Sequence, residues 1–154
     1  MLQTFYYLSA TQIPAMPDVH EPEVRSYNMS RIRSKDTKPE LFVRKFLFEN
    51  GFRYRLHVKD LPGKPDIVLP KYKTVIFVNG CFWHYHKGCR YFVLPKTRTE
   101  WWLQKLSNNQ IRDSKHIHEL EILGWKVIRI WTCELKTQRK EETLIWLIQE
   151  ISYI

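Results

Sequence analysis

The sequence PDIVLPKYKTVIFVNGC, residues 65–81, decides the fold. It holds two runs rich in β-branched residues, at 66–69 and 74–79, which predict two short strands separated by a turn. The second run contains no charged residue, as expected for a central strand that is buried on both faces, and Gly80 ends it. Asp66 therefore stands at the start of a strand, close to the turn that leads into the central strand.

Patterns on both sides of this stretch predict helices. Thr37-Lys38-Pro39-Glu40 has the spacing of a capping box, and apolar residues follow it at helical spacing as far as Gly51. Residues 52–58 alternate between apolar and basic, which predicts a half-buried strand with a basic outer face. The later predicted elements are a helix from about Thr99 to Leu123 with a break near Ser107, a strand at 125–131 and a closing helix at 138–151. This order of elements predicts an α/β protein.

The chain has the size and charge of a single basic domain. It has 154 residues, and 25 Lys and Arg against 16 Asp and Glu give a net charge of +9. This charge favours a polyanionic partner, nucleic acid first and an anionic membrane surface second, and charge alone does not separate the two. The uncharged apolar runs are far too short to cross a bilayer, which excludes a transmembrane protein.

The N-terminal part differs in composition from the rest. Residues 1–24 lack periodicity and contain three prolines, so an irregular N-terminal arm is predicted ahead of a single domain at 25–154. Residues 25–38 are polar and basic. They fit either a short basic helix that orders on DNA or a solvated face, and the sequence does not choose between them.

Four residues have the spacing of a closed zinc site. Cys81, His86 and Cys89 lie within nine residues, and Cys133, the third cysteine of the chain, follows a later predicted strand. Three thiolates and one imidazole complete a tetrahedral zinc shell with no open position, which predicts a structural ion. Two alternatives stay open: His84 as the ligand in place of His86, or Cys133 as a buried small hydrophobe and His86 as a surface residue.

Asp66 is the candidate for holding magnesium at a phosphodiester-cleaving site, since one divalent ion usually keeps only one or two protein carboxylates. Capping of the turn after Pro65 is the alternative role for this side chain. A Pro-Asp pair at a strand start, a hairpin and a buried strand ending in polar residues form the skeleton of restriction-enzyme-like nuclease folds. Those folds usually carry Asp or Glu, one residue and then Lys on the second strand. This chain has Val78-Asn79-Gly80-Cys81 there, so other residues must perform those roles.

Several motifs occur together and in a fixed order between about residues 18 and 136. They are Ser26-Tyr27-Asn28-Met29, Arg33-Ser34-Lys35-Asp36-Thr37, Pro62-Gly63-Lys64-Pro65-Asp66-Ile67-Val68, Val75 to His84, Thr97 to Trp102, and Gly124-Trp125 with Trp131-Thr132-Cys133-Glu134-Leu135. This set resembles the very short patch repair (Vsr) DNA mismatch endonucleases. The resemblance implies a restriction-endonuclease-like fold, a central mixed β-sheet flanked by helices, with one structural zinc. It also implies magnesium-dependent nicking of duplex DNA on the 5′ side of the thymine in a T:G mismatch, the product of 5-methylcytosine deamination.

The resemblance assigns catalytic roles to individual residues. Asp66 matches the magnesium-binding aspartate, and Val78 matches the residue whose backbone carbonyl reaches the metal. His84 matches the general base, Asp113 the acid that orients its imidazole, and Glu40 a glutamate near the metal shell.

The resemblance also covers the zinc ligands and the DNA contacts. It gives Cys81, His86, Cys89 and Cys133 as the zinc ligands, in agreement with the spacing argument. Phe82, Trp83 and Trp102 match aromatic residues that insert beside the mismatch from the major groove, and Met29 matches a residue that wedges in from the minor groove. The candidates for phosphate contacts are Arg53, Arg55, Arg98, Lys105 and Arg112.

Asn79 departs from the family pattern, because the best-known members have a second histidine at this position. The resemblance implies that this histidine acts on the scissile phosphate or the leaving group. An asparagine can donate a hydrogen bond but does not shuttle a proton at neutral pH. The departure puts the rate and the detailed mechanism in question. Lys87-Gly88 also lengthens the gap between His86 and Cys89 by one residue, which a zinc loop can absorb.

Three functions are weighed against one another. The first is a DNA nicking endonuclease with Mg²⁺ and Zn²⁺ that acts on T:G mismatches, as a monomer and with other mismatch-repair proteins as accessory partners. It would work in the bacterial cytoplasm, on the nucleoid, with no membrane contact. The second is a restriction or homing endonuclease of the same fold with another target. The third is a non-catalytic, zinc-stabilised DNA-binding module.

Overall fold

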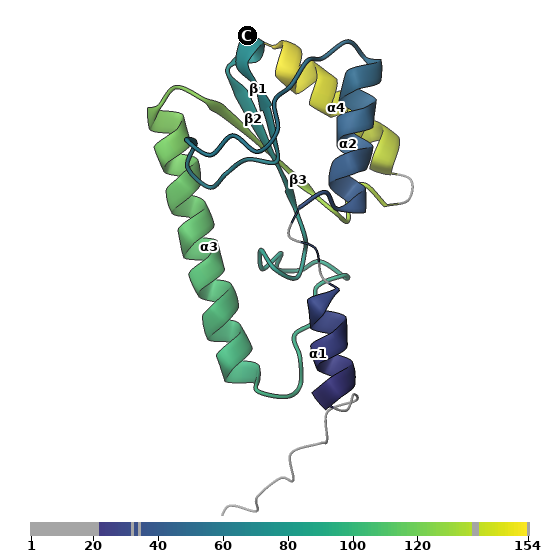
Figure 1. Cartoon of the computed structure of the whole chain (residues 1–154), viewed down its shortest axis with the longest axis vertical. Coiled ribbons are helices and arrows are strands. Elements are labelled where there is room, and N and C mark those ends of the chain that lie inside the picture. Colours follow the sequence, from purple (N-terminus) through teal and green to yellow (C-terminus); the bar gives the residue numbers. More distant parts are fainter. Residues whose placement is uncertain (1–21, 32, 34, 137–138, 154) are drawn as a thin grey trace, which may run out of the picture.

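The computed structural model describes residues 22–31, 33, 35–136 and 139–153. Its centre is a three-stranded mixed sheet in the order β1-β2-β3 (Figure 1). The strands are β1 (Ile67–Leu69), β2 (Thr74–Asn79) and β3 (Lys126–Trp131), and a short 3-10 turn, Pro70–Tyr72, joins the first two. β1 runs antiparallel to β2, whereas β3 runs parallel to it. The prediction that 74–79 forms the central strand is confirmed.

The described residues form the helices α1 (Pro22–Ser30), α2 (Lys38–Glu49), α3 (Thr99–Ile122) and α4 (Arg139–Ser152), of which the last three flank the sheet (Figure 1). α3 lies on one side of the sheet, and α2 and α4 lie on the other (Figure 1). The predicted α/β class, with a central mixed sheet flanked by helices, is confirmed. None of these helices, within the described residues, has the length and hydropathy needed to cross a membrane.

The core follows the alternation of side chains along β2. Ile76 and Val78 point into a cluster with residues of α2 and α4, which includes Leu47 and Leu147. Val75 points the other way, into a smaller cluster with Leu120 of α3 and the half-buried Phe77 and Trp125. Burial on both faces explains why this strand carries no charged residue. Asn79 at the end of β2 and the loop that follows it therefore lie where the strands β2 and β3 end.

The prediction of a strand at 52–58 is wrong. In this segment the structure has only an isolated bridge, in which Arg55 exchanges two backbone hydrogen bonds with Val68 (2.7 and 3.0 Å). His57 has a φ of +54°, a left-handed conformation that interrupts an extended chain. The alternation nevertheless predicted burial, because Phe52 is buried and Tyr54 packs partly against the core cluster, while Arg53 and Arg55 are exposed.

Two helices differ from their predicted bounds. α1 begins at Pro22, inside the segment predicted as an irregular arm, and ends at Ser30, well before the predicted end of the basic stretch at Lys38. Residues 1–21 of the predicted arm lie outside the described residues. α3 is one continuous helix from Thr99 to Ile122, so the predicted break near Ser107 is wrong.

Candidate functional site

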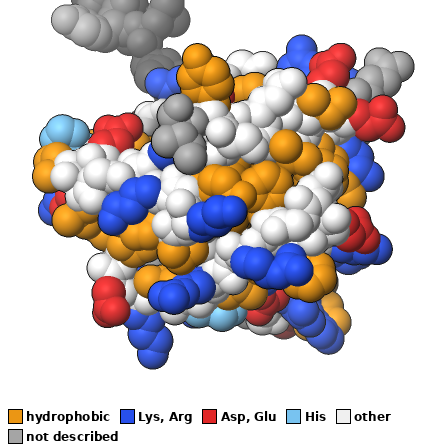
Figure 2. Space-filling view, turned by 90° about the horizontal axis from the view of Figure 1, so that it is seen from above, with side chains coloured by type: hydrophobic (Ala, Val, Ile, Leu, Met, Phe, Trp, Pro, Cys, Tyr) orange, Lys and Arg blue, Asp and Glu red, His pale blue; other side chains and the backbone are white. Residues whose placement is uncertain are grey.

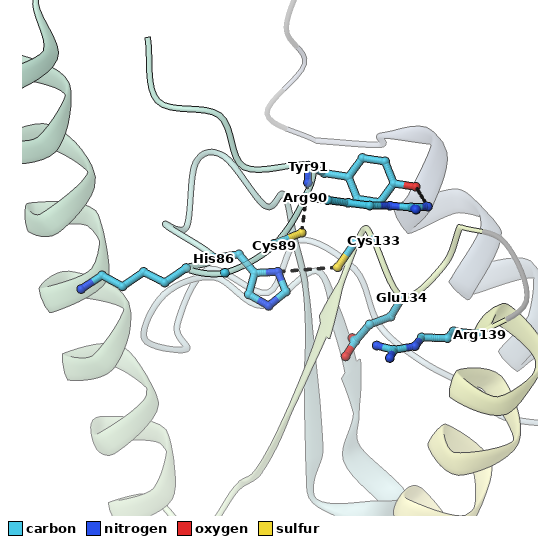
Figure 3. A pocket seen from close by; sticks show the side chains of 9 residues that line it. His86, Cys89, Arg90, Tyr91, Cys133, Glu134 and Arg139 are labelled. Carbon is cyan, nitrogen blue, oxygen red and sulfur yellow. Dashed lines mark hydrogen bonds between the residues drawn. The ribbon is translucent and has the colours of Figure 1, made fainter. Parts of the chain in front are cut away.

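The four candidate zinc ligands converge at the edge of the sheet. Cys81, His86 and Cys89 come from the loop after β2, and Cys133 comes from the turn after β3. The ligand atoms of all four residues lie within 4.8 Å of one another. Figure 3 shows the side chains of His86, Cys89 and Cys133 pointing toward one another from these two segments. A hollow of about 510 Å³ opens over this cluster, and its lining also contains Arg90 and Arg139.

The chemistry of the cluster suits a soft divalent metal ion. The Nδ1 atom of His86 lies 3.6 Å from Cys133 Sγ, and its imidazole stacks on Trp131 at 4.0 Å between ring centroids. The backbone N–H of Tyr91 donates to Cys89 Sγ (3.4 Å). Burial, together with the neighbouring thiols, raises the pKa of Cys133 to about 12. Three thiolates at neutral pH would therefore need a cation among them.

Asp66 lies just before β1 and faces the end of β2. Its Oδ2 atom accepts a hydrogen bond from the backbone N–H of Val78 (2.7 Å). Burial raises the pKa of this half-buried carboxyl to about 6, against the lowering effect of the Val78 N–H. The charge of Glu40 raises the pKa further, and the charges of Arg44 and His84 lower it. A carboxylate, a second acid and an imidazole therefore lie within electrostatic reach of one another.

Glu40 lies in the first turn of α2 and is 4% exposed. Its Oε1 accepts from the Thr37 hydroxyl (2.8 Å), and its Oε2 accepts from the Asp36 backbone N–H (2.9 Å) and from Arg44 (3.0 Å). Thr37 is the N-cap residue by its backbone, but its hydroxyl does not cap the helix. The hydrogen bonds of the predicted capping box are therefore wrong. The Glu40 carboxylate accepts from the Thr37 hydroxyl and from the Asp36 N–H, and the Thr37 hydroxyl accepts no hydrogen bond from the helix.

Arg44 completes this group of side chains and was missed by the sequence analysis. It is 5% exposed and contacts the carboxylates of both Glu40 and Asp36. The available signal was the spacing of Glu40 and Arg44, four residues apart on one helix, which places oppositely charged side chains side by side. On an exposed helix face this spacing is common, so it does not predict burial.

His84 and Asp113 form the second pair of candidate catalytic residues. His84 Nδ1 lies 2.6 Å from Asp113 Oδ2, which joins the loop after β2 to the middle of α3. A carboxylate accepting from Nδ1–H leaves the lone pair on Nε2. This contact takes His84 away from the metal cluster, so of the two alternative histidines the structure places His86 there.

Asn79, the last residue of β2, is buried beside this pair. It lines a pocket of about 180 Å³ together with His84, Asp113 and Arg129. Its backbone carbonyl accepts from the N–H of Thr132 (3.0 Å), which extends the pairing of the two strands by one residue. The backbone of Asn79 is therefore held by the sheet at the wall of a small pocket lined mostly by polar residues.

The predicted inserting aromatics form one cluster. Phe82 lies 5.0 Å from Trp83 and 5.2 Å from Trp102 between ring centroids, and Lys105 places its ammonium near both tryptophans (5.7 and 5.4 Å). The side chain of Asn109 donates to the carbonyl of Trp83 (3.1 Å), which ties the loop to α3. The cluster is therefore held by α3 as well as by the loop after β2.

The other predicted DNA contacts lie on exposed parts of the surface. Met29 of α1 is 41% exposed, and the Arg98 guanidinium lies 5.3 Å from the ring of the exposed Trp101. Lys and Arg side chains are also distributed over the face at the C-terminal end of the molecule, among exposed apolar side chains (Figure 2). The positive charge is therefore not confined to one patch.

Comparison with known proteins identifies the family. A family profile, DNA mismatch endonuclease Vsr, matches residues 17–90. A type II nicking enzyme of Neisseria meningitidis is 51% identical over 137 residues, which cover 88% of this chain and 97% of that protein. The DNA mismatch endonuclease Vsr of Escherichia coli is 42% identical over 137 residues, 88% of this chain and 87% of that protein. The chain belongs to the Vsr family. A type II nicking enzyme of Xanthomonas oryzae is also similar, at 50% identity over 120 residues, 78% of this chain and 88% of that protein.

Membership of the Vsr family confirms the resemblance found in the sequence. It makes the chain a DNA endonuclease, as predicted, and not a non-catalytic binding module. The family profile covers most of the candidate site, because the segment from Asp66 to Cys89 lies within its range and contains most of the candidate catalytic and metal-binding residues.

Replacing Cys133 with alanine is expected to abolish metal binding by the Cys/His cluster and to lower the melting temperature by roughly 10 °C or more, since metal binding contributes directly to folding. Elemental analysis and a thermal melt measure both effects. Asp66→Ala is the control and should keep the metal of the Cys/His cluster, because Asp66 is not one of its four residues. A Cys133→Ala melting curve that overlays the parent would rule out the assigned ligand set.

Replacing Asp66 with asparagine is expected to stabilise the protein when no magnesium is added. The pKa of about 6 lies above the ordinary aspartate value, so ionised Asp66 costs stability. The cost is absent below about pH 4 and complete above about pH 6, and removing it should add ~1–3 kcal/mol at pH 8. Denaturant unfolding at pH 4 and pH 8 measures this difference. Asp60→Asn, at an exposed carboxylate, should change nothing, and an equal gain at both pH values would contradict the explanation.

Proposed function

We propose that this protein is a magnesium-dependent nicking endonuclease that cleaves duplex DNA on the 5′ side of the thymine in a T:G mismatch. The observation that carries the proposal is the half-buried Asp66 carboxylate, held against the end of β2 and within electrostatic reach of Glu40 and His84. An aspartate at a strand start beside a central strand also fits the restriction-endonuclease-like fold, which we propose for the chain. Similarity to nicking enzymes and to a mismatch endonuclease supports the reaction.

Asp66 and the backbone carbonyl of Val78 are the proposed magnesium ligands. In an extended strand the N–H and C=O of one residue face the same side, so the Val78 carbonyl lies on the side where its N–H contacts Asp66. Bound magnesium would offset negative charge on the phosphate and make water more acidic. Both oxygens of Glu40 already accept protein donors, so we propose that Glu40 orders the shell around the metal without coordinating it directly.

His84 is the proposed general base. Asp113 accepts from Nδ1–H and holds the ring, so Nε2 takes the proton from the attacking water. Asn79 lines the same pocket, and we propose that its amide donates a hydrogen bond to the scissile phosphate or the leaving oxygen. In this proposal His84 alone accepts the proton of the attacking water.

Zinc is the proposed ion of the Cys81, His86, Cys89 and Cys133 cluster, with a structural role. Three thiolates and an imidazole fill a tetrahedral shell, which leaves no position for substrate or water. The cluster would tie the loop after β2 to the end of β3. Because this loop carries Phe82, Trp83 and His84, the ion would stiffen both the proposed wedge and the proposed base.

Mismatch recognition is proposed to rely on the aromatic cluster. Phe82, Trp83 and Trp102 would insert from the major groove and Met29 from the minor groove, because unstacking costs less where base pairing is already poor. The cations Lys105 and Arg98 beside the rings would contact the phosphates. We further propose a monomer that acts on the bacterial nucleoid in the cytoplasm, with other mismatch-repair proteins as accessory partners.

The test is strand-specific cleavage of a labelled duplex with one T:G mismatch, beside its matched control, with magnesium and with EDTA. A nick 5′ to the mismatched thymine, absent from the matched duplex and from EDTA, is expected. In Asp66→Asn the nick should disappear, with a loss of roughly a thousandfold or more. Equal cleavage of both duplexes would keep an endonuclease of this fold but contradict the mismatch specificity.

Replacing Asn79 with histidine is expected to raise the nicking rate roughly tenfold at pH 7, because an imidazole adds a group that can transfer a proton. The pocket of about 180 Å³ has room for the larger ring. Single-turnover nicking from pH 5.5 to 8.5 measures the effect. Asn79→Ser, which removes the amide without adding a titrating group, should be slower than the parent. A rate for Asn79→His at or below that of the serine variant would contradict the argument.

A further inference from the structure

The acids of the proposed metal site have a buried counter-ion of their own. Arg44 is 5% exposed, and its guanidinium donates to Glu40 (3.0 Å) and to the Asp36 carboxylate. Its charge also favours the ionised form of Asp66, whereas the charge of Glu40 opposes it. One buried arginine therefore pairs with two carboxylates at the start of α2, and it also lies within electrostatic reach of Asp66.

A purely stabilising role does not account for this arginine. Replacing a buried ion pair by well-packed apolar residues is often neutral or favourable, so burying Arg44 and Glu40 is a poor way to gain stability. The Nε atom of Arg44 is also buried without a hydrogen-bond partner in the described part of the protein, which adds a further cost. The guanidinium is directed toward carboxylates, at the expense of its own full set of hydrogen bonds.

We propose that Arg44 is a positioning residue of the nicking reaction, which fixes the Glu40 carboxylate beside Asp66 and offsets the charge of this acid pair until a divalent cation binds. The inference rests on the proposed function, in which Asp66 holds the metal. Lysine is a poor substitute, because a single ammonium lacks the planar fork that contacts Glu40 and Asp36 together. Arg44 touches neither substrate nor metal in this scheme and acts through Glu40.

A double-mutant cycle tests the route through Glu40. Arg44→Met should lower kcat for T:G nicking about tenfold or more and leave KM for DNA within about twofold. In a Glu40→Gln background the same substitution should cost less than about threefold, since the partner through which it acts is already changed. Equal losses in the two backgrounds, or a loss that appears in KM, would overturn the proposal.

The matched control is Lys45→Met on the exposed face of the same helix. Lys45 pairs with Glu49 at the same four-residue spacing (3.8 Å), and its side chain is 76% exposed. It should keep parental kcat within about twofold. Arg44→Lys, which retains the charge, serves if the methionine variant does not fold, and it should fall between the parent and the tenfold loss. A lysine variant as fast as the parent would overturn the need for the guanidinium fork.

A binding measurement separates this inference from the proposed function. At pH 8, Arg44→Met should bind Mn²⁺ about threefold more tightly than the parent, because a positive charge beside the acids has been removed. Lys45→Met should bind it as the parent does. Tighter binding with slower nicking is not expected from simple loss of structure. Unchanged or weaker Mn²⁺ binding would overturn the proposal even if the parent failed to nick a T:G duplex.

Discussion

The parallel pairing of β2 with β3 is the constraint on which the rest of the site depends. The register places Asn79 opposite Trp131, and the Thr132 N–H continues the pairing past the last residue of β2. Cys81 and Cys133 each follow these partners by two residues, so the ladder itself brings the two cysteines together. The metal cluster extends a sheet that is already formed, and it need not organise the loop unaided.

The position of Asp66 lowers the stability of the fold but suits the proposed binding of a cation. Its burial beside Glu40 raises the pKa, so the ionised form that a cation needs is the form that the fold tolerates less well. The Val78 N–H and the charge of Arg44 recover part of this cost. The site thus keeps a carboxylate that is desolvated enough to attract a cation strongly and still ionises near neutral pH.

The sequence predicted those elements whose patterns are local. Two short apolar runs and a turn were sufficient for β1 and β2, and helical spacing was sufficient for the core of α2. The prediction of a strand at 52–58 was wrong because alternation indicates only which side chains are buried. A strand also needs a neighbouring strand to pair with, and β1 has only three residues. The hydrogen bonds of Glu40 were predicted wrongly for a similar reason. The burial of its carboxylate depends on tertiary contacts that a capping motif does not encode.

In the candidate site, too, the sequence predicted what depends on local spacing and missed what depends on tertiary contacts. Ligand spacing predicted the metal cluster but left His84 and His86 as alternatives, and only the contact of His84 with Asp113 on a distant helix separates them. With Asn79 unable to transfer a proton, His84 is the one proton acceptor proposed for this reaction. Anything that moves its ring away from Asp113 should therefore affect the rate more than the affinity for DNA. The anchoring of the loop to α3, through both Asp113 and the contact of Asn109 with Trp83, thus joins the position of the base to that of the aromatic wedge.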